Sequence, residues 1–202
     1  MAENNIEVTA LKLGLLGDSA VGKTAICQTF LGIEFKEDNI STIGAEKMDK
    51  KIILKNGKEI KLILWDTAGE ERFRAAALKA IRTVQGIALV FDVTEKKSFD
   101  SINNWLEEIK DNFQNPSLVL LGNKIDMGKE KWQVTQEEID ALVKQKNLVY
   151  YPTSAKTNEG ITESFNYLAN ITYDKVTAKE NKGDKKKNIE LNQKKKDKKK
   201  CC

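Results

Sequence analysis

The sequence predicts an α/β domain with an open, doubly wound, mainly parallel six-stranded sheet, one antiparallel strand and about five helices. Short apolar runs alternate with segments of helical spacing, which is typical of parallel strands connected by helices. The runs at 87–92 and 118–122 are almost wholly apolar, as expected for strands covered on both faces. Because such sheets bind ligands outside the carboxyl ends of their strands, we expect the functional residues there.

Each element follows from a local pattern. Strands are predicted at residues 8–16, 50–55, 59–65, 87–92, 118–122 and 147–151, and helices at 22–31, 98–112, 135–146 and 161–176. Asn56-Gly57 separates the second and third strands, and this dipeptide favours a tight hairpin, so the two strands are predicted to be antiparallel. Thr135 and Glu138 have the spacing of a capping box and mark the beginning of the third helix.

Composition excludes several classes of function. The 202 residues are 40% hydrophobic and 32% charged, which suits one domain with a buried core, and they include no histidine. The Ser-His-Asp hydrolases and His-ligated zinc sites are therefore excluded. Three cysteines, of which two are the last residues, do not form a disulfide framework. The first ten residues carry acidic and amide side chains where a secretory signal has bases and an apolar run, so a cytosolic location is expected.

The charge is distributed unevenly along the chain. Twelve lysines and four acidic residues lie at 175–202, so this segment has a net charge of +8, whereas residues 1–174 have a net charge of −4. The sequence predicts a domain at 1–176 and a lysine-rich tail at 177–202, which lacks the apolar side chains needed to fold and is expected to be disordered. The tail has no arginine or aromatic residue among its lysines, so nucleic acid is not an expected partner.

A glycine-rich loop follows the first predicted strand. Residues 17–24 match the pattern G-x-x-x-x-G-K-[ST] and lead into the first predicted helix. In such a loop, backbone N–H groups surround phosphates, Lys23 reaches the β- and γ-phosphates, and Thr24 binds Mg²⁺. The predicted nucleotide contacts in this stretch are Asp18, Ser19, Ala20, Val21, Gly22, Lys23, Thr24 and Ala25. The loop by itself admits ATPases, kinases and GTPases.

Three further stretches narrow this choice. Residues 63–69 (Ile-Leu-Trp-Asp-Thr-Ala-Gly) place Asp66 at the end of an apolar strand, where a carboxylate can hold Mg²⁺. Residues 121–126 (Leu-Gly-Asn-Lys-Ile-Asp) and 153–156 (Thr-Ser-Ala-Lys) follow two other strands. Together with the phosphate loop, these motifs resemble those of the Ras-superfamily small GTPases, whose fold is the small G domain of the P-loop NTPases.

The resemblance implies that the ligand is GTP or GDP. It implies that Asp126 accepts hydrogen bonds from two N–H groups of guanine, that Asn123 braces the loop and that Lys124 packs under the ring. Adenine lacks this pair of donors and would leave the carboxylate unpaired. The loop Ser154-Ala155-Lys156 would bring the Ala155 amide to guanine O6, and Phe35 would cover the other face of the base.

The resemblance also implies a switch that depends on the γ-phosphate. Thr42 would contact Mg²⁺ and the γ-phosphate, and Gly69 would contact the same phosphate, so its loss would loosen residues 37–47 and 69–82. The implied Mg²⁺ ligands are Thr24, Thr42 and Asp66. The implied catalytic residues are Lys23, Thr42 and Glu70.

Within the superfamily, the chain is most similar to the Rab branch. The matching stretches are residues 41–44, 71–74 and 91–94, together with Trp65 and the final Cys201-Cys202. The resemblance implies geranylgeranyl groups on both cysteines, with the basic tail adding attraction to anionic lipids. It implies exchange factors, GTPase-activating proteins, effectors, and prenylation, escort and GDI-type proteins as partners. The implied location is the cytoplasmic face of an endomembrane or the plasma membrane, with a cytosolic pool, and the implied role is vesicle trafficking.

Glu70 departs from the family pattern, because active members carry glutamine there to orient the attacking water. Glutamate keeps an acceptor for water, loses the donor and brings negative charge toward a negative transition state. Our hypothesis is a slow GTPase that responds poorly to an activating protein. The alternative is a membrane-tethered GTP-binding scaffold with little or no hydrolysis.

The expected partner surface departs as well. Lys47 and Ala80 stand where Rab proteins usually have aromatic residues, while Trp65 is kept. Losing two aromatic contacts predicts weak or absent binding of familiar Rab effectors. The alternative is neutral drift with unchanged partners.

Overall fold

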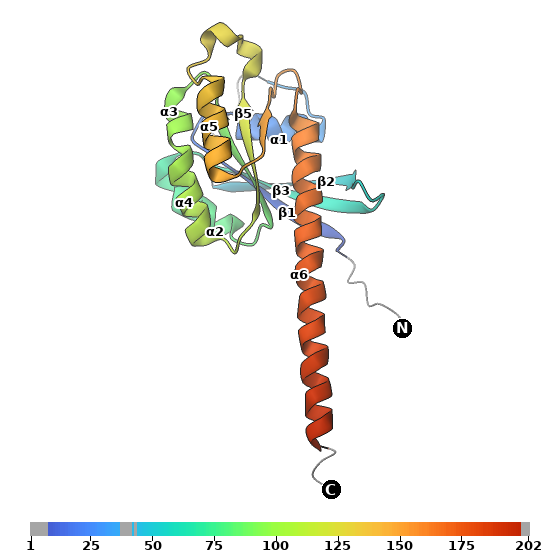
Figure 1. Cartoon of the computed structure of the whole chain (residues 1–202). Coiled ribbons are helices and arrows are strands. Elements are labelled where there is room, and N and C mark those ends of the chain that lie inside the picture. The colour runs from blue at the N-terminus through green and yellow to red at the C-terminus, as the bar shows by residue number, and fades with distance from the viewer. Residues whose placement is uncertain (1–7, 37–41, 43, 199–202) are drawn as a thin grey trace.

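The computed structural model describes residues 8–36, 42 and 44–198, with side chains up to residue 179 except that of residue 71. Its six-stranded sheet has the order β2-β3-β1-β4-β5-β6 (Figure 1). Within the described residues, β2 and β3 pair antiparallel and the other neighbouring strands pair parallel. The predicted doubly wound α/β class, with one antiparallel strand, is therefore confirmed.

The elements alternate along the chain as the sequence pattern predicts. The strands are β1 (Ala10–Leu16), β2 (Ala45–Ile53), β3 (Glu59–Thr67), β4 (Gly86–Asp92), β5 (Ser117–Asn123) and β6 (Tyr150–Pro152). The α-helices are α1 (Lys23–Leu31), α2 (Arg74–Ile81), α3 (Lys96–Asp100), α4 (Ile102–Asn112), α5 (Gln136–Lys146) and α6 (Ile161–Lys198). Short 3₁₀ turns are η1 (Glu71–Phe73), η2 (Ile125–Met127) and η3 (Lys129–Lys131).

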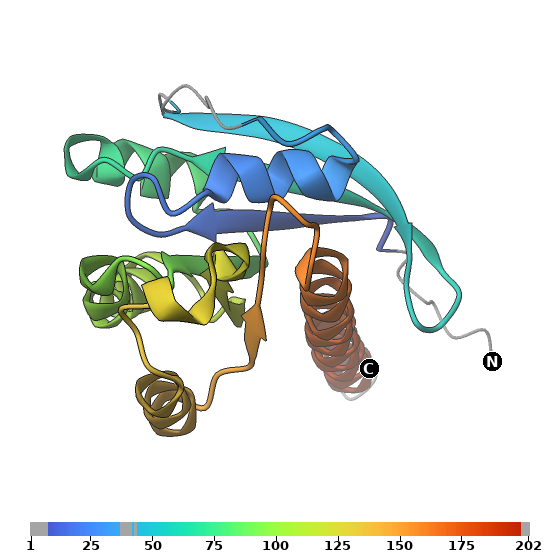
Figure 2. The same cartoon turned by 90° about the horizontal axis from the view of Figure 1, so that it is seen from above.

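Helices cover both faces of the sheet and bury two apolar clusters. One cluster joins the sheet to α1 and α6, where the rings of Phe30 and Phe165 stack with centroids 4.3 Å apart. The other joins the opposite face to α2, α4 and α5, with Trp105 buried at its centre. Figure 2 shows α5 and α6 on opposite sides of β6. Burial of whole aromatic and branched side chains on both faces supplies the main driving force for folding, about 2 kcal/mol for each such side chain.

Some boundaries differ from the predicted ones. The predicted helix at 98–112 is divided into α3 and α4 at Ser101, where the hydroxyls of Ser98 and Ser101 donate to the backbone carbonyls of Glu95 and Lys97 at 2.7 and 3.0 Å. Such local bonds compete with continuous helix. β6 begins later than predicted because Asn147 takes a left-handed conformation and caps α5. The predicted capping box of Thr135 and Glu138 is confirmed.

The last helix is longer than predicted. We expected it to end near Val176, but α6 continues to Lys198 and projects well beyond the sheet (Figure 1). Lysine, glutamate and alanine favour helix, and residues 177–198 contain no proline, which explains the continuation. Among the described side chains of α6, Val176 is the last apolar one that packs against the core cluster. Across residues 8–36, 42 and 44–198, no helix is both long and apolar enough to cross a membrane.

Candidate functional site

A cavity of about 550 Å³ lies at the carboxyl ends of β1, β3, β5 and β6. Its lining comes from the loops that leave these strands, with residues 35 and 42 added from the segment before β2. The lining residues are Ser19, Ala20, Gly22, Lys23, Thr24, Ala25, Phe35, Thr42, Thr67, Gly69, Glu70, Asn123, Lys124, Asp126, Met127, Ala155 and Lys156. Parallel strands direct these loops to one edge, which is why distant motifs meet there.

The backbone of the glycine-rich loop between β1 and α1 demands its two glycines. Gly17 has a φ of 143°, and a Cβ there would lie 2.1 Å from the carbonyl oxygen of Val90. Gly22 has a φ of 98°, and a Cβ would lie 2.3 Å from Nδ2 of Asn123. At these two positions the loop lies so close to β4 and β5 that only glycine fits. The backbone N–H groups that follow Gly22 belong to the beginning of α1.

Lys23 is held inside this loop. Its side chain is 5% exposed, and Nζ donates to the carbonyl oxygens of Gly17 and Asp18 at 2.9 and 2.7 Å. Burial lowers the pKa of Lys23 to about 8, and the nearby carboxylates of Asp66 and Asp18 offset part of this shift. A buried ammonium group with backbone acceptors is poised to exchange them for the oxygens of an anionic ligand.

Three oxygen-bearing side chains converge at the cavity, where Thr24 and Thr42 belong to the lining and Asp66 lies behind them. Oδ2 of Asp66 accepts from Thr24 Oγ1 at 2.6 Å and from Thr42 Oγ1 at 3.0 Å, and the two hydroxyls are 2.8 Å apart. Among the residues that the structure describes, Oδ1 of Asp66 is buried and has no hydrogen-bond partner. Burial raises the pKa of Asp66, while the two hydroxyls oppose the shift. A buried carboxylate oxygen that lacks a partner beside two hydroxyls fits a hard cation such as Mg²⁺.

The donor set does not suit zinc. Over the described part of the chain, no group of three or more His, Cys, Asp or Glu side chains is placed to hold a metal ion. Cys27 is buried in the core, and burial raises the pKa of its thiol. The oxygen donors of Thr24, Thr42 and Asp66 are thus the candidate cation ligands, and Mg²⁺ characteristically keeps further positions for water and phosphate.

At the other end of the cavity, Asn123 ties three loops together. Its Nδ2 donates to the carbonyl of Val21 at 2.8 Å, and its Oδ1 accepts from the Ala155 amide at 3.3 Å. Asp126 lines the cavity, and its Oδ1 accepts from Ser154 Oγ at 2.7 Å. Asp126 thus faces the cavity with one oxygen already oriented by Ser154. Such a carboxylate can bind a ligand edge that presents two N–H donors.

Lys124 has a partner that sequence reasoning did not identify. Its Nζ lies 2.6 Å from Oδ2 of Asp92, whose other oxygen accepts from the backbone N–H and the hydroxyl of Thr94. Asp92 pairs in register with Asn123 across β4 and β5, so the two strands place the acid under Lys124. The signal available in the sequence was a lone acid at the end of an apolar strand.

Most predicted site residues lie around the cavity. The predicted residues that do not line it are Asp18, Val21, Asp66 and Ser154, whose backbone or side chains support those that do. Sequence reasoning missed Thr67 and Met127, which line the cavity beside predicted residues. Cys201 and Cys202 lie outside the described residues, as do residues 37–41 and 43 of the first predicted switch.

The side chain of Asp18 points toward the helices. Its Oδ1 accepts from Nε1 of Trp105 on α4 at 2.8 Å and lies 3.6 Å from Arg74 at the start of α2. The guanidinium of Arg74 in turn lies 4.1 Å from the centroid of the Trp105 ring. The phosphate loop is therefore tied to α2 and α4 through one carboxylate.

Glu70 lies on the cavity wall beside the phosphate loop. Its neighbour Gly69 packs so closely that a Cβ there would be 2.4 Å from both Lys23 Nζ and the Asp18 carbonyl oxygen. The Glu70 side chain is 31% exposed, and its Oε2 lies 2.6 Å from Nε of Arg72. The acid is therefore part of the cavity and part of an ion pair.

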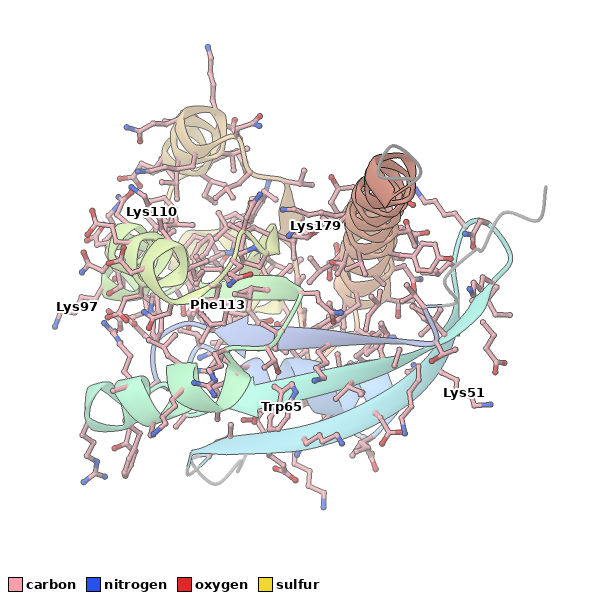
Figure 3. All side chains as sticks on the ribbon, turned by 90° about the horizontal axis from the view of Figure 1, so that it is seen from below. Lys51, Trp65, Lys97, Lys110, Phe113 and Lys179 are labelled. Atoms are coloured by element: carbon pink, nitrogen blue, oxygen red, sulfur yellow. The ribbon has the colours of Figure 1, made fainter. Side chains whose placement is uncertain are left out.

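The strand pair β2–β3 carries the predicted partner surface. Lys47 lies opposite Trp65 in the β2–β3 register, and the Lys47 side chain is exposed. Trp65 packs in part against the cluster that includes α2, and Figure 3 shows it on β3 beside that helix. Ala80 is exposed on α2. The resemblance to Rab proteins led us to expect aromatic residues at three positions. The structure has a half-buried tryptophan at one of them, and a lysine and an alanine at the other two.

Comparison with known proteins agrees with the geometry. The sequence model of the Ras family matches residues 12–174. The chain is 42% identical to Ras-related protein Rab-13 of Mesocricetus auratus over 159 residues, which are 78% of this chain and 77% of the relative. It is 41% identical to Ras-related protein Rab-8B of Homo sapiens over 171 residues, 84% and 82% of the two chains. It is 37% identical to Ras-related protein SEC4 of Saccharomyces cerevisiae over 167 residues, 82% and 76%.

Proposed function

This chain belongs to the Ras family of small GTPases, and from that premise we propose that it is a Rab-like switch whose GTP-bound form recruits effectors in membrane traffic. Its ligand is a guanine nucleotide and its reaction is the hydrolysis of GTP. The observation that carries the proposal is the arrangement of one cavity, with Lys23 at one end and Asp126 at the other. The nucleotide phosphates would contact Lys23, and the base would contact Asp126 and the Ala155 amide.

Mg²⁺ is the proposed metal. Thr24, Thr42 and Asp66 would hold it, since they supply hard oxygen donors and one oxygen of Asp66 has no partner among the described residues. When bound, the ion would neutralise charge that develops on the phosphates. Thr42 also joins the segment before β2 to the phosphate loop through Thr24. Thr42 is also proposed to contact the terminal phosphate, so loss of that phosphate would release the segment, which is the proposed basis of switching.

Glu70 is proposed to make hydrolysis slow. It would accept a hydrogen bond from the attacking water, but it lacks the donor of glutamine and carries a charge that the transition state disfavours. We expect Glu70→Gln to hydrolyse bound GTP about tenfold faster than the wild type, and to respond more strongly to an activating protein. The measurement is single-turnover release of phosphate from protein whose copurified nucleotide has first been identified.

The same measurement separates the two candidate activities. A wild type that is as fast as Glu70→Gln, with and without an activator, would contradict the role given to Glu70. Retention of GTP over hours, with release only in Glu70→Gln, would favour the membrane-tethered scaffold over the slow GTPase. A copurified adenine nucleotide would contradict the proposed function itself.

The partner surface is proposed to have lost affinity for common Rab effectors. Lys47 and Ala80 present a charge and a methyl group where large aromatic rings would fill a partner's pockets. The double variant Lys47→Phe/Ala80→Tyr is expected to gain at least about tenfold in GTP-dependent affinity for a general Rab effector. Titration of the effector against GTP-loaded and GDP-loaded protein measures this. Normal binding by the wild type would instead indicate unchanged partners.

The segment at 177–202 is proposed as a membrane tether distinct from the domain at 1–176. Two observations support this division: Val176 is the last described apolar side chain of α6 that packs against the core, and residues 175–202 have a net charge of +8. Cys201 and Cys202 are proposed to carry geranylgeranyl groups, and two chains anchor a protein stably where one is marginal. The proposed location is the cytoplasmic face of an endomembrane or the plasma membrane, with a cytosolic pool. Exchange factors, activating proteins, escort and GDI-type proteins are the proposed regulators.

A further inference from the structure

The Glu70 carboxylate has a counter-ion in its own loop. Nε of Arg72 lies 2.6 Å from Oε2 of Glu70. The Phe73 N–H donates to the Glu70 carbonyl at 2.9 Å, which closes a tight turn between the two residues. The Arg72 guanidinium also lies 4.8 Å from the centroid of the Phe73 ring. Backbone and ring together therefore hold the guanidinium next to the carboxylate.

The charge of Glu70 belongs to the phosphate end of the cavity. Glu70 directly follows Gly69, which packs against Lys23 and the Asp18 carbonyl, and Glu70 lines the cavity with Lys23. Asp126, the other acid in the lining, lies at the opposite end with Ser154. A carboxylate placed in this way acts most strongly on the terminal phosphate of a bound nucleotide.

Lys23 and Lys124, two other cations in the lining, are each held by partners of their own. Nζ of Lys23 is bonded to two carbonyl oxygens of the phosphate loop, and Nζ of Lys124 is paired with Asp92 at the far end. In the part of the chain that the structure describes, the ion pair of Glu70 is with Arg72. The Arg72 side chain is 73% exposed, so the pair adds little to folding stability and its charge is screened by salt.

We propose that Arg72 is a positioning residue that neutralises Glu70 and thereby prevents this carboxylate from weakening the binding of a nucleoside triphosphate relative to a diphosphate. The inference rests on the proposed function. The γ-phosphate brings additional negative charge close to Glu70, so an unpaired carboxylate repels GTP more than GDP. A glutamine at this position would need no counter-ion, whereas glutamate does.

The test compares the affinities of a non-hydrolysable GTP analogue and of GDP in four proteins: wild type, Arg72→Gln, Glu70→Gln and the double variant. Arg72→Gln is expected to lower the ratio of analogue affinity to GDP affinity about fivefold, because it leaves Glu70 charged and unpaired. In the Glu70→Gln background, the same change is expected to alter the ratio less than about twofold. Arg72→Lys keeps the charge and is expected to retain most of the ratio.

Salt and a matched control sharpen the result. Raising the salt to about 0.5 M is expected to shrink the effect of Arg72→Gln, since exposed charges are screened. Arg82→Gln removes an identical group from an exposed position at the end of α2 that does not line the cavity, and the ratio is expected to stay unchanged.

Two results would overturn the inference while leaving the proposed function intact. One is an equal loss of analogue and GDP affinity in Arg72→Gln, which would mean that Arg72 only supports the loop. The other is a change in the ratio that is the same with Glu70 and with Gln at position 70. If the wild type binds neither nucleotide, the proposed function fails as well.

Discussion

Asp126→Asn is expected to lower GDP affinity by at least about a hundredfold and to create affinity for xanthosine diphosphate. The guanine edge presents two N–H donors, which a carboxylate accepts and an asparagine side chain does not match. Xanthine presents one donor and one acceptor on the same edge, and these fit the oxygen and the amino group of asparagine. Competition between the two diphosphates for the protein measures the exchange of specificity.

The structure provides a control for this change. Ser154 Oγ lies 2.7 Å from Oδ1 of Asp126 and orients it, so Ser154→Ala is expected to weaken GDP binding about tenfold without improving xanthosine diphosphate binding. If Asp126→Asn weakens both diphosphates equally, Asp126 does not read the base, and the proposed orientation of the nucleotide is wrong.

Lys23→Gln is expected to reduce the affinity for GDP and GTP about a hundredfold. The buried Nζ of Lys23 would exchange the carbonyls of Gly17 and Asp18 for phosphate oxygens, and glutamine cannot supply this charge. Nucleotide dissociation constants at pH 7 measure the loss. Unchanged affinity would show that the phosphates lie elsewhere.

The pKa of Lys23 gives this prediction a separate test. Because the pKa is lowered to about 8 in the free site and bound phosphates favour the charged form, binding takes up a proton above pH 8. The affinity of the wild type is therefore expected to fall several-fold between pH 8 and pH 9. Lys23→Arg stays protonated and is expected to show a flatter profile, and Lys23→Gln has no such proton to lose.

The stability of the free protein changes with pH in the opposite direction to the nucleotide affinity. The folded pKa of Lys23 lies below its ordinary value of 10.5, so the unfolded chain binds more protons between about pH 8 and 10.5. Lys23 therefore destabilises the free protein below pH 8, and this cost is relieved as the pH rises through the window. A decline of nucleotide affinity above pH 8 thus cannot be attributed to unfolding caused by Lys23.

Local patterns were sufficient for most of the fold. The alternation of apolar runs and helical segments predicted the sheet, and Asn56-Gly57 predicted the antiparallel pair that β2 and β3 form. The last helix was predicted to end too early, because the prediction followed the loss of apolar side chains and not helix propensity. Among the side chains that the structure describes, Val176 is the last apolar one of α6 that packs against the core, whereas helix propensity carries α6 on to Lys198. The two criteria place the boundary differently because one reports buried contacts and the other local backbone preference.

The phosphate loop, the acid after β3 and the Asn-Lys-x-Asp stretch could be found in the sequence because each is a short motif whose backbone performs a local task. The contacts that motif residues make with distant parts of the chain could not be found in the sequence. Asp92 reaches Lys124 through the register of β4 and β5, and Asp18 reaches Trp105 through the packing of α4. The number of residues between two positions in the sequence does not tell how close their side chains lie in the fold.

The sequence by itself determined the fold class and the presence of an acid at position 70, and it predicted which residues would contact the phosphates and the base. Only the three-dimensional structure showed which charged group lies next to that acid. A tight turn and the Phe73 ring bring Arg72 to 2.6 Å from Glu70, and Gly69 presses the turn against Lys23. The physical reason is that charge type is a property of a residue, whereas the interaction of charges depends on distance, which only packing sets.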